Sequence, residues 1–296
     1  MPTSTKLPAG CSRGLCALFD SLCAQSVRDY DPAFEFPGWP DELDKKQWFT
    51  SPELVSLNGT SAWARLDVEQ QQLVSFWDAV NFFSANVHGE AALMQGIASR
   101  LYKPEHGVAS PYMHHMLDEE NKHSVYFSEF CFRYGGKIYQ DRMLNLGSDP
   151  EEGADLLFFT RVMIFEDVVD SFNKTMARDE TLVPVVRWIN ENHHREERRH
   201  LAFGRARVRE LFAAGVEKWS PALLAEVRRL IAAYLTALWV PLYNPTVYAD
   251  AGLADPYRLA NEAHHSPYAR AQRAVLSRRS VGFLMRSKIL LERPEL

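Results

Sequence analysis

The chain has 296 residues, with 33 Lys and Arg against 38 Asp and Glu, which gives a formal net charge of −5. Hydrophobic residues make up 46% and charged residues 24% of the sequence, as is usual for folded proteins. This composition excludes an intrinsically disordered chain, a collagen-like chain and a strongly basic nucleic-acid-binding protein. The length allows one large domain or two smaller ones, with a sizeable buried core in either case.

Cysteine usage and hydropathy bear on the compartment. Three of the four cysteines, Cys11, Cys16 and Cys23, lie near the N-terminus, and their spacing predicts neither a disulfide framework nor a zinc site. The first 25 residues lack the sustained apolar segment of a secretory signal. The longest apolar run, residues 230–243, is shorter than the roughly 20 residues of a membrane-spanning helix. We therefore expect a cytoplasmic protein that has no contact with membranes or nucleic acids.

The predicted elements are irregular structure followed by helices. Residues 1–65 are rich in Pro, Ser, Gly and Asp, which predicts an irregular extension packed on the rest, with at most one short helix near residues 13–29. The hydrophobic period then changes to about 3.6 residues, which indicates helices. The predicted helices cover 67–101, 110–134, 151–178, 182–214, 220–240 and 255–279. No β-alternation separates them, so we expect 66–296 to form a single all-α helical bundle.

Four of these helices carry acidic or imidazole side chains on the face that also carries their apolar residues. In chain order these side chains are Glu90, the pair Glu120 and His123, Glu166, and the pair Glu197 and His200. An unpaired carboxylate on a buried helix face is costly, so this pattern calls for a counter-charge in the core.

The spacing of these residues predicts a dinuclear metal site. Residues three apart on a helix lie on the same side, so each Glu-x-x-His pair presents a carboxylate and an imidazole to one point. Two such helices, with one Glu from each of two others, supply the ligands of carboxylate-bridged dinuclear sites in helical bundles. Two divalent ions would neutralise the four carboxylates, and this mixture of oxygen and nitrogen ligands suits iron or manganese. A lone Glu-x-x-His is usually a solvated pair, but four helices in this order favour the metal site.

The order of these residues resembles that of di-iron carboxylate proteins such as ferritin-like oxidases, ribonucleotide reductase small subunits, acyl-carrier-protein desaturases and multicomponent hydroxylases. It is most similar to the p-aminobenzoate N-oxygenase family of arylamine oxygenases, because a further histidine, His193, lies one turn before Glu197. His193, Glu197 and His200 then lie on one helix face. The resemblance covers residues 68–210 with specific motifs and implies a ferritin-like bundle with a dinuclear centre in its core.

The resemblance also implies a role for each ligand. Glu90 and His123 would be terminal ligands of one iron ion, and Glu120 and Glu197 would bridge the two ions. Glu166, His193 and His200 would bind the second iron ion. O2 would be the co-substrate, an external electron donor would be required, and no catalytic residue beyond the ligands is implied. Glu119 and Glu196 are left open, either as hydrogen-bond acceptors for the ligand imidazoles or as surface residues.

The predicted function is that of an O2-dependent di-iron N-oxygenase in natural product biosynthesis. Its substrate would be a primary amine, either aromatic or an amino acid or carrier-protein-tethered group, oxidised to a hydroxylamine, nitroso or nitro product. The alternatives are a di-iron hydroxylase or desaturase acting on a C–H bond, a ferritin-like iron oxidase and a helical interaction protein without metal. The C-terminal residues Arg286 and Lys288 are candidates for binding a substrate carboxylate. We also expect a redox partner, and a homodimer is one possible state. The identities of the substrate and of the electron donor stay open.

Overall fold

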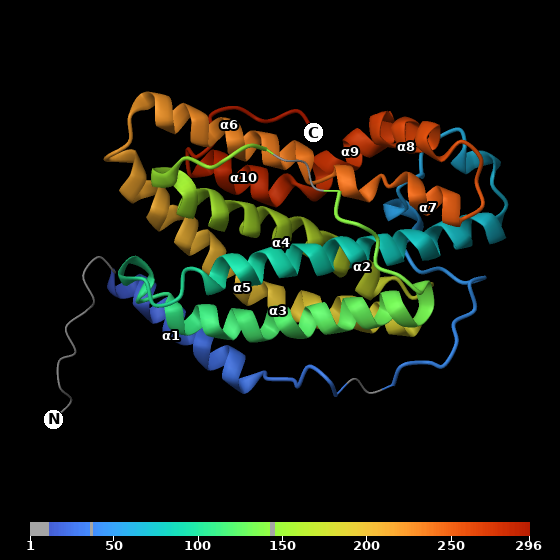
Figure 1. The fold of residues 1–296 in the computed structure, drawn as a ribbon, viewed down its shortest axis with the longest axis horizontal. Helices are drawn as coiled ribbons and strands as arrows, with labels where there is room; N and C mark the ends of the chain where they lie inside the picture. Colours follow the sequence, from blue (N-terminus) through green and yellow to red (C-terminus); the bar gives the residue numbers. More distant parts are fainter. Residues whose placement is uncertain (1–11, 36–37, 143–145) are drawn as a thin grey trace.

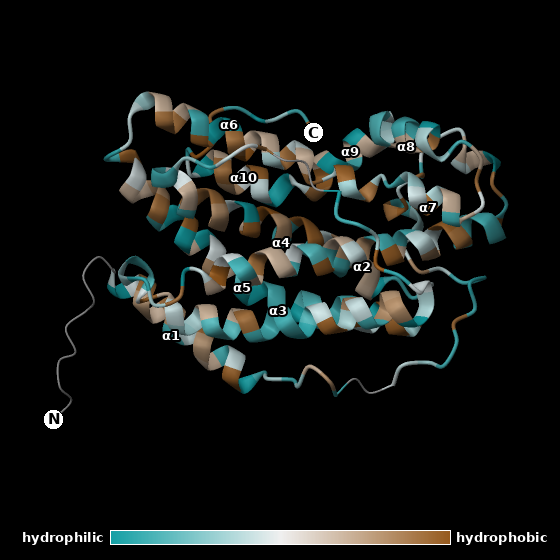
Figure 2. Ribbon diagram, in the orientation of Figure 1, coloured by the Kyte–Doolittle hydropathy of each residue, from teal (hydrophilic) through white to brown (hydrophobic). Residues whose placement is uncertain are grey.

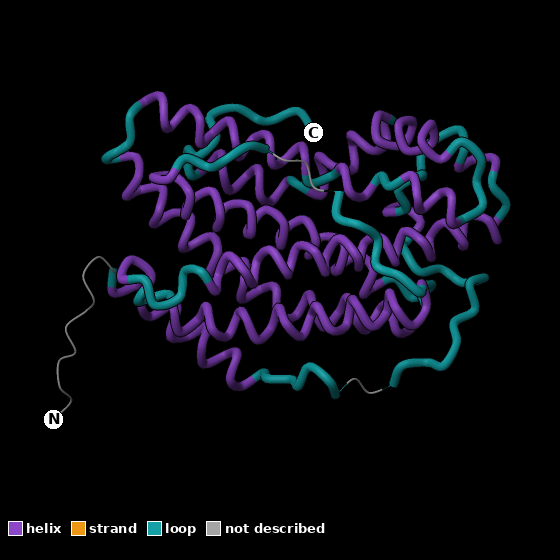
Figure 3. Tube along the Cα trace, in the orientation of Figure 1, coloured by secondary structure: helices purple, strands orange, loops and turns teal. Residues whose placement is uncertain are grey.

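The protein is described by a computed structural model that covers residues 12–35, 38–142 and 146–296. Its bundle consists of four long helices that lie side by side in Figure 1: α2 (Val68–Ala98), α3 (Ser110–Phe130), α4 (Ala154–Arg178) and α5 (Pro184–Val216). The closest packing joins α2 to α3 and α4 to α5. Figure 3 shows only helices and loops in the described parts of the chain, so the predicted all-α class is confirmed.

Shorter helices cover the two sides of this bundle. Helix α1 (Arg13–Arg28) packs on α3 and α5, and α6 (Pro221–Ala237) and α10 (Arg278–Arg286) pack on α4 (Figure 1). Helices α7 (Pro245–Asp250), α8 (Pro256–His265) and α9 (Pro267–Leu276) follow α6 along the chain, and α7 packs on α2. The bundle core is therefore enclosed between α1 on one side and α6 with the C-terminal helices on the other.

Local sequence signals explain where the long helices begin. Helix α2 starts with a capping box, in which the Asp67 side chain accepts from the Gln70 N–H and the Gln70 side chain accepts from the Asp67 N–H. Helix α5 starts at Pro184, whose missing N–H costs nothing at the first helical position. Helix α3 runs into a π-helical turn at Cys131–Gly135 and ends before Gly136, which has a φ of 69°.

The helices predicted from the sequence agree with the structure, with one clear exception. The short helix and the first five long helices expected from the sequence correspond to α1 to α6, with ends displaced by a few residues. The continuous helix predicted over 255–279 is wrong, because the chain breaks at Ser266 and restarts as α9. The Ser266 hydroxyl accepts from the Ala269 N–H, and Pro267 cannot donate to the preceding turn, so both residues favour a new helix start. Helices α7 and α10 were not predicted.

Polar side chains are concentrated inside the bundle. Figure 2 shows α3 as hydrophilic along much of its length, although its residues Glu119, Glu120, Lys122 and His123 are all buried. Where α2 approaches α4, a Cβ atom on Gly89 would lie 2.2 Å from Cζ of Phe165, and one on Gly96 only 2.0 Å from Cε2 of Phe158. Because the two glycines have no side chain, these aromatic rings of α4 can pack directly against the backbone of α2.

Two predictions on location and domains are not settled by the fold. No helix in the described residues is long and apolar enough to cross a membrane. Cys23 and Cys131 carry free thiols and Cys16 is disulfide-bonded, while Cys11 lies outside the described residues. A disulfide at Cys16 does not point to a reducing compartment, so the cytoplasmic location stays a prediction. The division into an extension, 1–65, and one domain, 66–296, also stays a prediction.

Asp78 ties the segment that precedes α2 to the bundle. Its carboxylate accepts from the N–H and the hydroxyl of Ser56 at 2.7 and 2.8 Å, and the Ser56 hydroxyl lies 2.9 Å from that of Tyr248 in α7. Burial raises the pKa of Asp78 to about 7, although both bonds from Ser56 act in the opposite direction. This carboxyl group therefore ionises within the folded protein only near neutral pH.

We expect Asp78→Asn to reduce the dependence of stability on pH. The folded pKa of about 7 exceeds the unfolded value of 3.8, so the contribution of Asp78 is full below pH 4 and is lost as the pH rises through 7. Each unit of pKa difference corresponds to about 1.4 kcal/mol. Urea unfolding at pH 5 and pH 8, with both proteins in the same metal state, should show a smaller loss of stability for the variant. Equal losses in the two proteins would contradict this assignment.

Candidate metal centre

The seven predicted ligands meet in the middle of the four-helix bundle. Helix α2 supplies Glu90, α3 supplies Glu120 and His123, α4 supplies Glu166, and α5 supplies His193, Glu197 and His200. Each of these residues is at most 1% exposed. The structure therefore brings together all seven residues from four helices, as the spacing of the motifs predicted. Their role as metal ligands remains a prediction.

The ligand atoms form three overlapping sets, in each of which all atoms lie within 4.8 Å of one another. The sets are Glu90 with Glu120, His123 and His193; Glu166 with His193 and Glu197; and Glu120 with Glu197 and His200. Glu120 and Glu197 each belong to two sets, as bridging carboxylates would. His193 also belongs to two sets, because its Nε2 lies 2.9 Å from Glu197 and 3.8 Å from Glu90. The added histidine thus reaches both halves of the cluster.

The donor set fits two divalent cations. Neither carboxylate oxygen of Glu90 or of Glu166 accepts a hydrogen bond from any residue in the described ranges, and all four oxygens are buried. Buried carboxylates without donors are strongly unfavourable, and a bound cation removes that penalty. Carboxylate and imidazole together suit iron or manganese. The four carboxylates and three imidazoles of helices α2 to α5 would therefore hold the two ions.

The pKa shifts of the central carboxylates also indicate that the cluster lacks positive charge. Burial, together with the charges of Glu120 and Glu197, raises the pKa of Glu90 well above its usual value. Burial and the charges of Glu197, Glu90 and Glu120 also raise the pKa of Glu166 well above its usual value. In contrast, His200 and His193 hold the pKa of Glu197 well below its usual value, although burial opposes them. The protein alone thus supplies too little positive charge for its four central carboxylates.

A second layer of carboxylates orients two of the imidazoles. His123 turns Nδ1 towards Glu120 at 2.8 Å, and its Nε2 lies 2.8 Å from an oxygen of Glu196. His200 turns Nδ1 towards Glu197 at 3.1 Å, and its Nε2 lies 2.7 Å from an oxygen of Glu119. An Nε2–H that donates to a carboxylate leaves the Nδ1 lone pair free for a metal ion.

In this second layer, α3 and α5 each supply a carboxylate that contacts a histidine of the other helix. Glu119 and Glu196 are buried, so their proposed role as acceptors is the correct one of the two alternatives. Lys122 lies 2.5 Å from Glu196 and Arg199 lies 2.7 Å from Glu119, and each cation directly precedes a histidine that is a predicted ligand. Together with His200, Arg199 lowers the pKa of Glu119 to about 2 against the effect of burial. Sequence reasoning missed both cations, although each occurs at the same position of its Glu-Glu-x-x-His motif.

His193 contacts a side-chain amide, whereas His123 and His200 contact carboxylates of the second layer. Its Nδ1 lies 2.7 Å from the side-chain amide of Asn173 in α4, a residue that the sequence did not single out as functional. When Nε2 of His193 binds a cation, Nδ1 carries the proton and needs an acceptor. Rotation of the Asn173 amide would place its otherwise unpartnered Oδ1 there. Asn173 would then fix the orientation of this ring.

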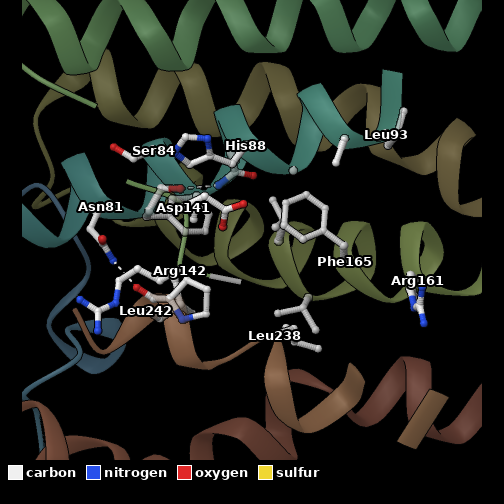
Figure 4. A pocket seen from close by; sticks show the side chains of 18 of the residues that line it. Asn81, Ser84, His88, Leu93, Asp141, Arg142, Arg161, Phe165, Leu238 and Leu242 are labelled. Atoms are coloured by element: carbon white, nitrogen blue, oxygen red, sulfur yellow. Dashed lines mark hydrogen bonds between the residues drawn. The ribbon is translucent and has the colours of Figure 1, made fainter. Parts of the chain in front are cut away.

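An apolar cavity of about 260 Å³ adjoins the ligand-bearing segments of α2 and α4. Its lining includes Asn86, Gly89 and Leu93 around Glu90, and Val162, Phe165 and Val169 around Glu166. Figure 4 shows Phe165 and Leu238 pointing into this space, with Arg142 and Arg161 towards opposite ends. Arg286 and Lys288 are exposed and do not belong to this lining, so the cavity gives no support to their binding a substrate carboxylate.

A second group of potential ligands, Glu105, His106 and Asp155, is less suitable for a metal ion. His106 uses one ring nitrogen to accept from Arg207 at 2.6 Å and lies with the other 3.0 Å from Asp155. Arg100 also donates to Asp155 at 2.9 Å. The guanidinium groups already supply the positive charge that an ion would bring, so this group is best explained as a structural network around the buried His106.

Comparison with known proteins identifies the family. A family model described as p-aminobenzoate N-oxygenase AurF matches residues 16–287, which is most of the chain. The protein belongs to this family. The resemblance inferred from His193 and the two Glu-x-x-His motifs is therefore confirmed. No curated protein matches the sequence.

Solved structures support the ferritin-like architecture. Two single-substitution variants of an R2-like ligand-binding oxidase, both with an aerobically reconstituted Mn/Fe cofactor, are 14% identical to this chain with TM-scores of 0.52. The alignment covers 98% of each chain for one variant and 94% of each for the other. At this identity the likeness shows the fold. The family model therefore places the protein in an N-oxygenase family, and the solved structures show the same fold.

Replacing Glu196 tests the second layer. Glu196→Ala leaves the His123 N–H and the buried Lys122 ammonium group without their acceptor, so we expect metal affinity to fall by about 10- to 100-fold. Glu196→Gln keeps an acceptor for His123 and should lose less. Competition with a fluorescent chelator measures both affinities. Wild-type affinity in Glu196→Ala would show that this carboxylate does not support the site.

Replacing His193 tests the added histidine. His193→Ala removes one of the seven predicted ligands and leaves the other six in place. The fold should therefore persist, while the second ion should bind more weakly. Circular dichroism checks the helix content, and Mössbauer spectroscopy of the iron-loaded protein reports on the centre. A dinuclear spectrum identical to that of the wild type would contradict a ligand role for His193.

Proposed function

We propose that this protein is an O2-dependent N-oxygenase that oxidises a primary amine at a di-iron centre. The observation that carries the proposal is the buried set of four carboxylates and three imidazoles, including His193, beside an apolar cavity. Membership of the p-aminobenzoate N-oxygenase family supports amine nitrogen as the atom that is oxidised. The products would be a hydroxylamine and, after further oxidation, a nitroso or nitro compound.

The seven predicted ligands and the two carboxylates behind them each have a definite task in this proposal. The residues that would hold the two iron ions are Glu90, Glu120, His123, Glu166, His193, Glu197 and His200. When bound, the iron ions would supply the activation of O2, with electrons from an external donor. Glu119 and Glu196 keep the Nε2 protons of the two imidazoles in place, so the protonation state of these ligands stays fixed.

The cavity supports a neutral, largely apolar amine as the substrate. Phe165, Val162, Val169 and Leu238 line it, and such a lining favours an apolar ligand. A charged ammonium group would lose its hydration here, whereas an aromatic amine is uncharged at neutral pH. A small-molecule arylamine is therefore the preferred substrate class, with a carrier-tethered amine as the alternative form.

Metal content is the first expected result. Anaerobic loading with ferrous iron and removal of the excess should leave two irons per chain, measured by mass spectrometry. Glu166→Ala should lower this stoichiometry, because Glu166 contributes two of the unpartnered central oxygens. Glu105→Ala is the matched control from the second acidic group and should still bind two ions. No bound metal in the wild type would overturn the proposal.

Turnover is the second expected result. The iron-loaded protein, a chemical reductant and isotopically labelled O2 should convert a primary arylamine to a product with labelled oxygen on nitrogen. Liquid chromatography with mass spectrometry locates the label. Label only on carbon would favour the alternative hydroxylase or desaturase, and rapid iron oxidation without any labelled organic product would favour a ferritin-like iron oxidase.

A further inference from the structure

The side chain of Asn86 carries an unused hydrogen-bond acceptor. Asn86 lies in α2, is 1% exposed and lines the apolar cavity. Its Nδ2 donates to the carbonyl oxygen of Phe82 at 2.7 Å. A carbonyl oxygen can only accept, so this bond fixes which end of the amide is which. The Oδ1 atom is therefore the free end, and no residue in the described ranges donates to it.

This acceptor is unusual within the cavity lining. Among the described residues that line the cavity, the buried polar atoms without a hydrogen-bond partner are Asn86 Oδ1 and Arg161 Nε. Arg161 is already engaged, because both its terminal nitrogens donate to Asp149 at 2.8 and 2.7 Å. No described residue donates to Asn86 Oδ1, and buried acceptors in folded proteins nearly always have a donor. An unfilled acceptor on a residue of the cavity lining is available to a ligand that donates.

The position of Asn86 relates this acceptor to the metal centre. Asn86 precedes the predicted ligand Glu90 by one helical turn, so the two side chains lie on neighbouring parts of the same side of α2. Their Cα atoms are about 6 Å apart along the helix axis. A group held by Asn86 in the cavity would therefore lie close to the centre that Glu90 helps to form.

We propose that Asn86 Oδ1 accepts a hydrogen bond from an N–H of the substrate amine and positions its nitrogen for oxidation. This inference rests on the proposed function and names the residue that recognises the amine. A primary amine has two N–H bonds and a lone pair, so it can donate to Asn86 and keep the lone pair free to react. A methyl group of similar size in place of the amine has no proton to donate, and Asn86 therefore selects nitrogen over carbon.

The test compares two probes of similar shape, aniline and toluene. Titration calorimetry of the anaerobic, iron-loaded protein gives both dissociation constants without turnover. The wild type should bind aniline more tightly than toluene by about tenfold, the effect of one buried hydrogen bond. In Asn86→Leu this preference should disappear, while two irons remain bound and the melting temperature does not fall. If leucine does not fit, Asn86→Ala removes the same acceptor.

Asn190 in α5 provides the matched control. Its Nδ2 donates to the carbonyl oxygen of Val186 at 2.8 Å and its Oδ1 is buried and unpartnered, but it does not belong to the cavity lining. Asn190→Leu should therefore keep the preference for aniline. A preference that survives in both Asn86 variants, or that is absent in the wild type, overturns the inference.

The outcomes separate this inference from the proposed function. If the wild type oxidises arylamines but the variants of Asn86 keep the full preference for aniline, the function stands and the role of Asn86 falls. If the preference depends on Asn86 but no amine is oxidised, Asn86 recognises amines and the assigned reaction is wrong. Because binding is measured without O2, the two results are independent.

Discussion

The charge balance of the bundle core is the constraint on which the rest of the structure depends. Six of the carboxylates that helices α2 to α5 bury belong to the candidate metal centre and its second layer: Glu90, Glu119, Glu120, Glu166, Glu196 and Glu197. Lys122 and Arg199 balance the second-layer pair, Glu119 and Glu196. The remaining four have only imidazoles beside them, and Glu90 and Glu166 have no hydrogen-bond donor among the described residues. Such a core is stable as a charged cluster only with added cations, so metal binding and folding should be linked.

The same constraint fixes the register of α3 against α5 and gives the centre two different sides. A shift of one residue would take Glu119 away from His200 and Glu196 away from His123 at once. Helix α1 covers the outer side of this network, where the Phe19 and Phe203 rings lie 5.1 Å apart. The cavity lies on the other side, against α2 and α4. Helices α3 and α5 therefore hold the imidazoles, while α2 and α4 supply carboxylates and the wall of the cavity.

Much of this arrangement could be predicted because ligands on helices follow the helical period. The spacing of Glu120 to His123 and of Glu197 to His200 places each pair on one face without any tertiary information. The burial of Glu119 and Glu196 could not be predicted in this way, because it depends on α3 facing α5. The cavity depends on the path of α2 past Phe158 and Phe165, which the sequence does not specify. The break before Pro267 was predictable, since Ser266-Pro267 is a common start of a helix.

Placing the amine-recognising group and a metal ligand on one helix has a mechanical consequence. Asn86 and Glu90 are separated by a single turn of α2, a helix that packs along α3. Their separation therefore does not change when loops around the cavity move. A nitrogen atom bound at Asn86 would keep a constant distance from the centre in every conformation of the cavity wall, whereas the rest of the substrate contacts apolar side chains that can adjust. Nitrogen selectivity would then come from α2, and tolerance for different amines from Phe165, Leu238 and their neighbours.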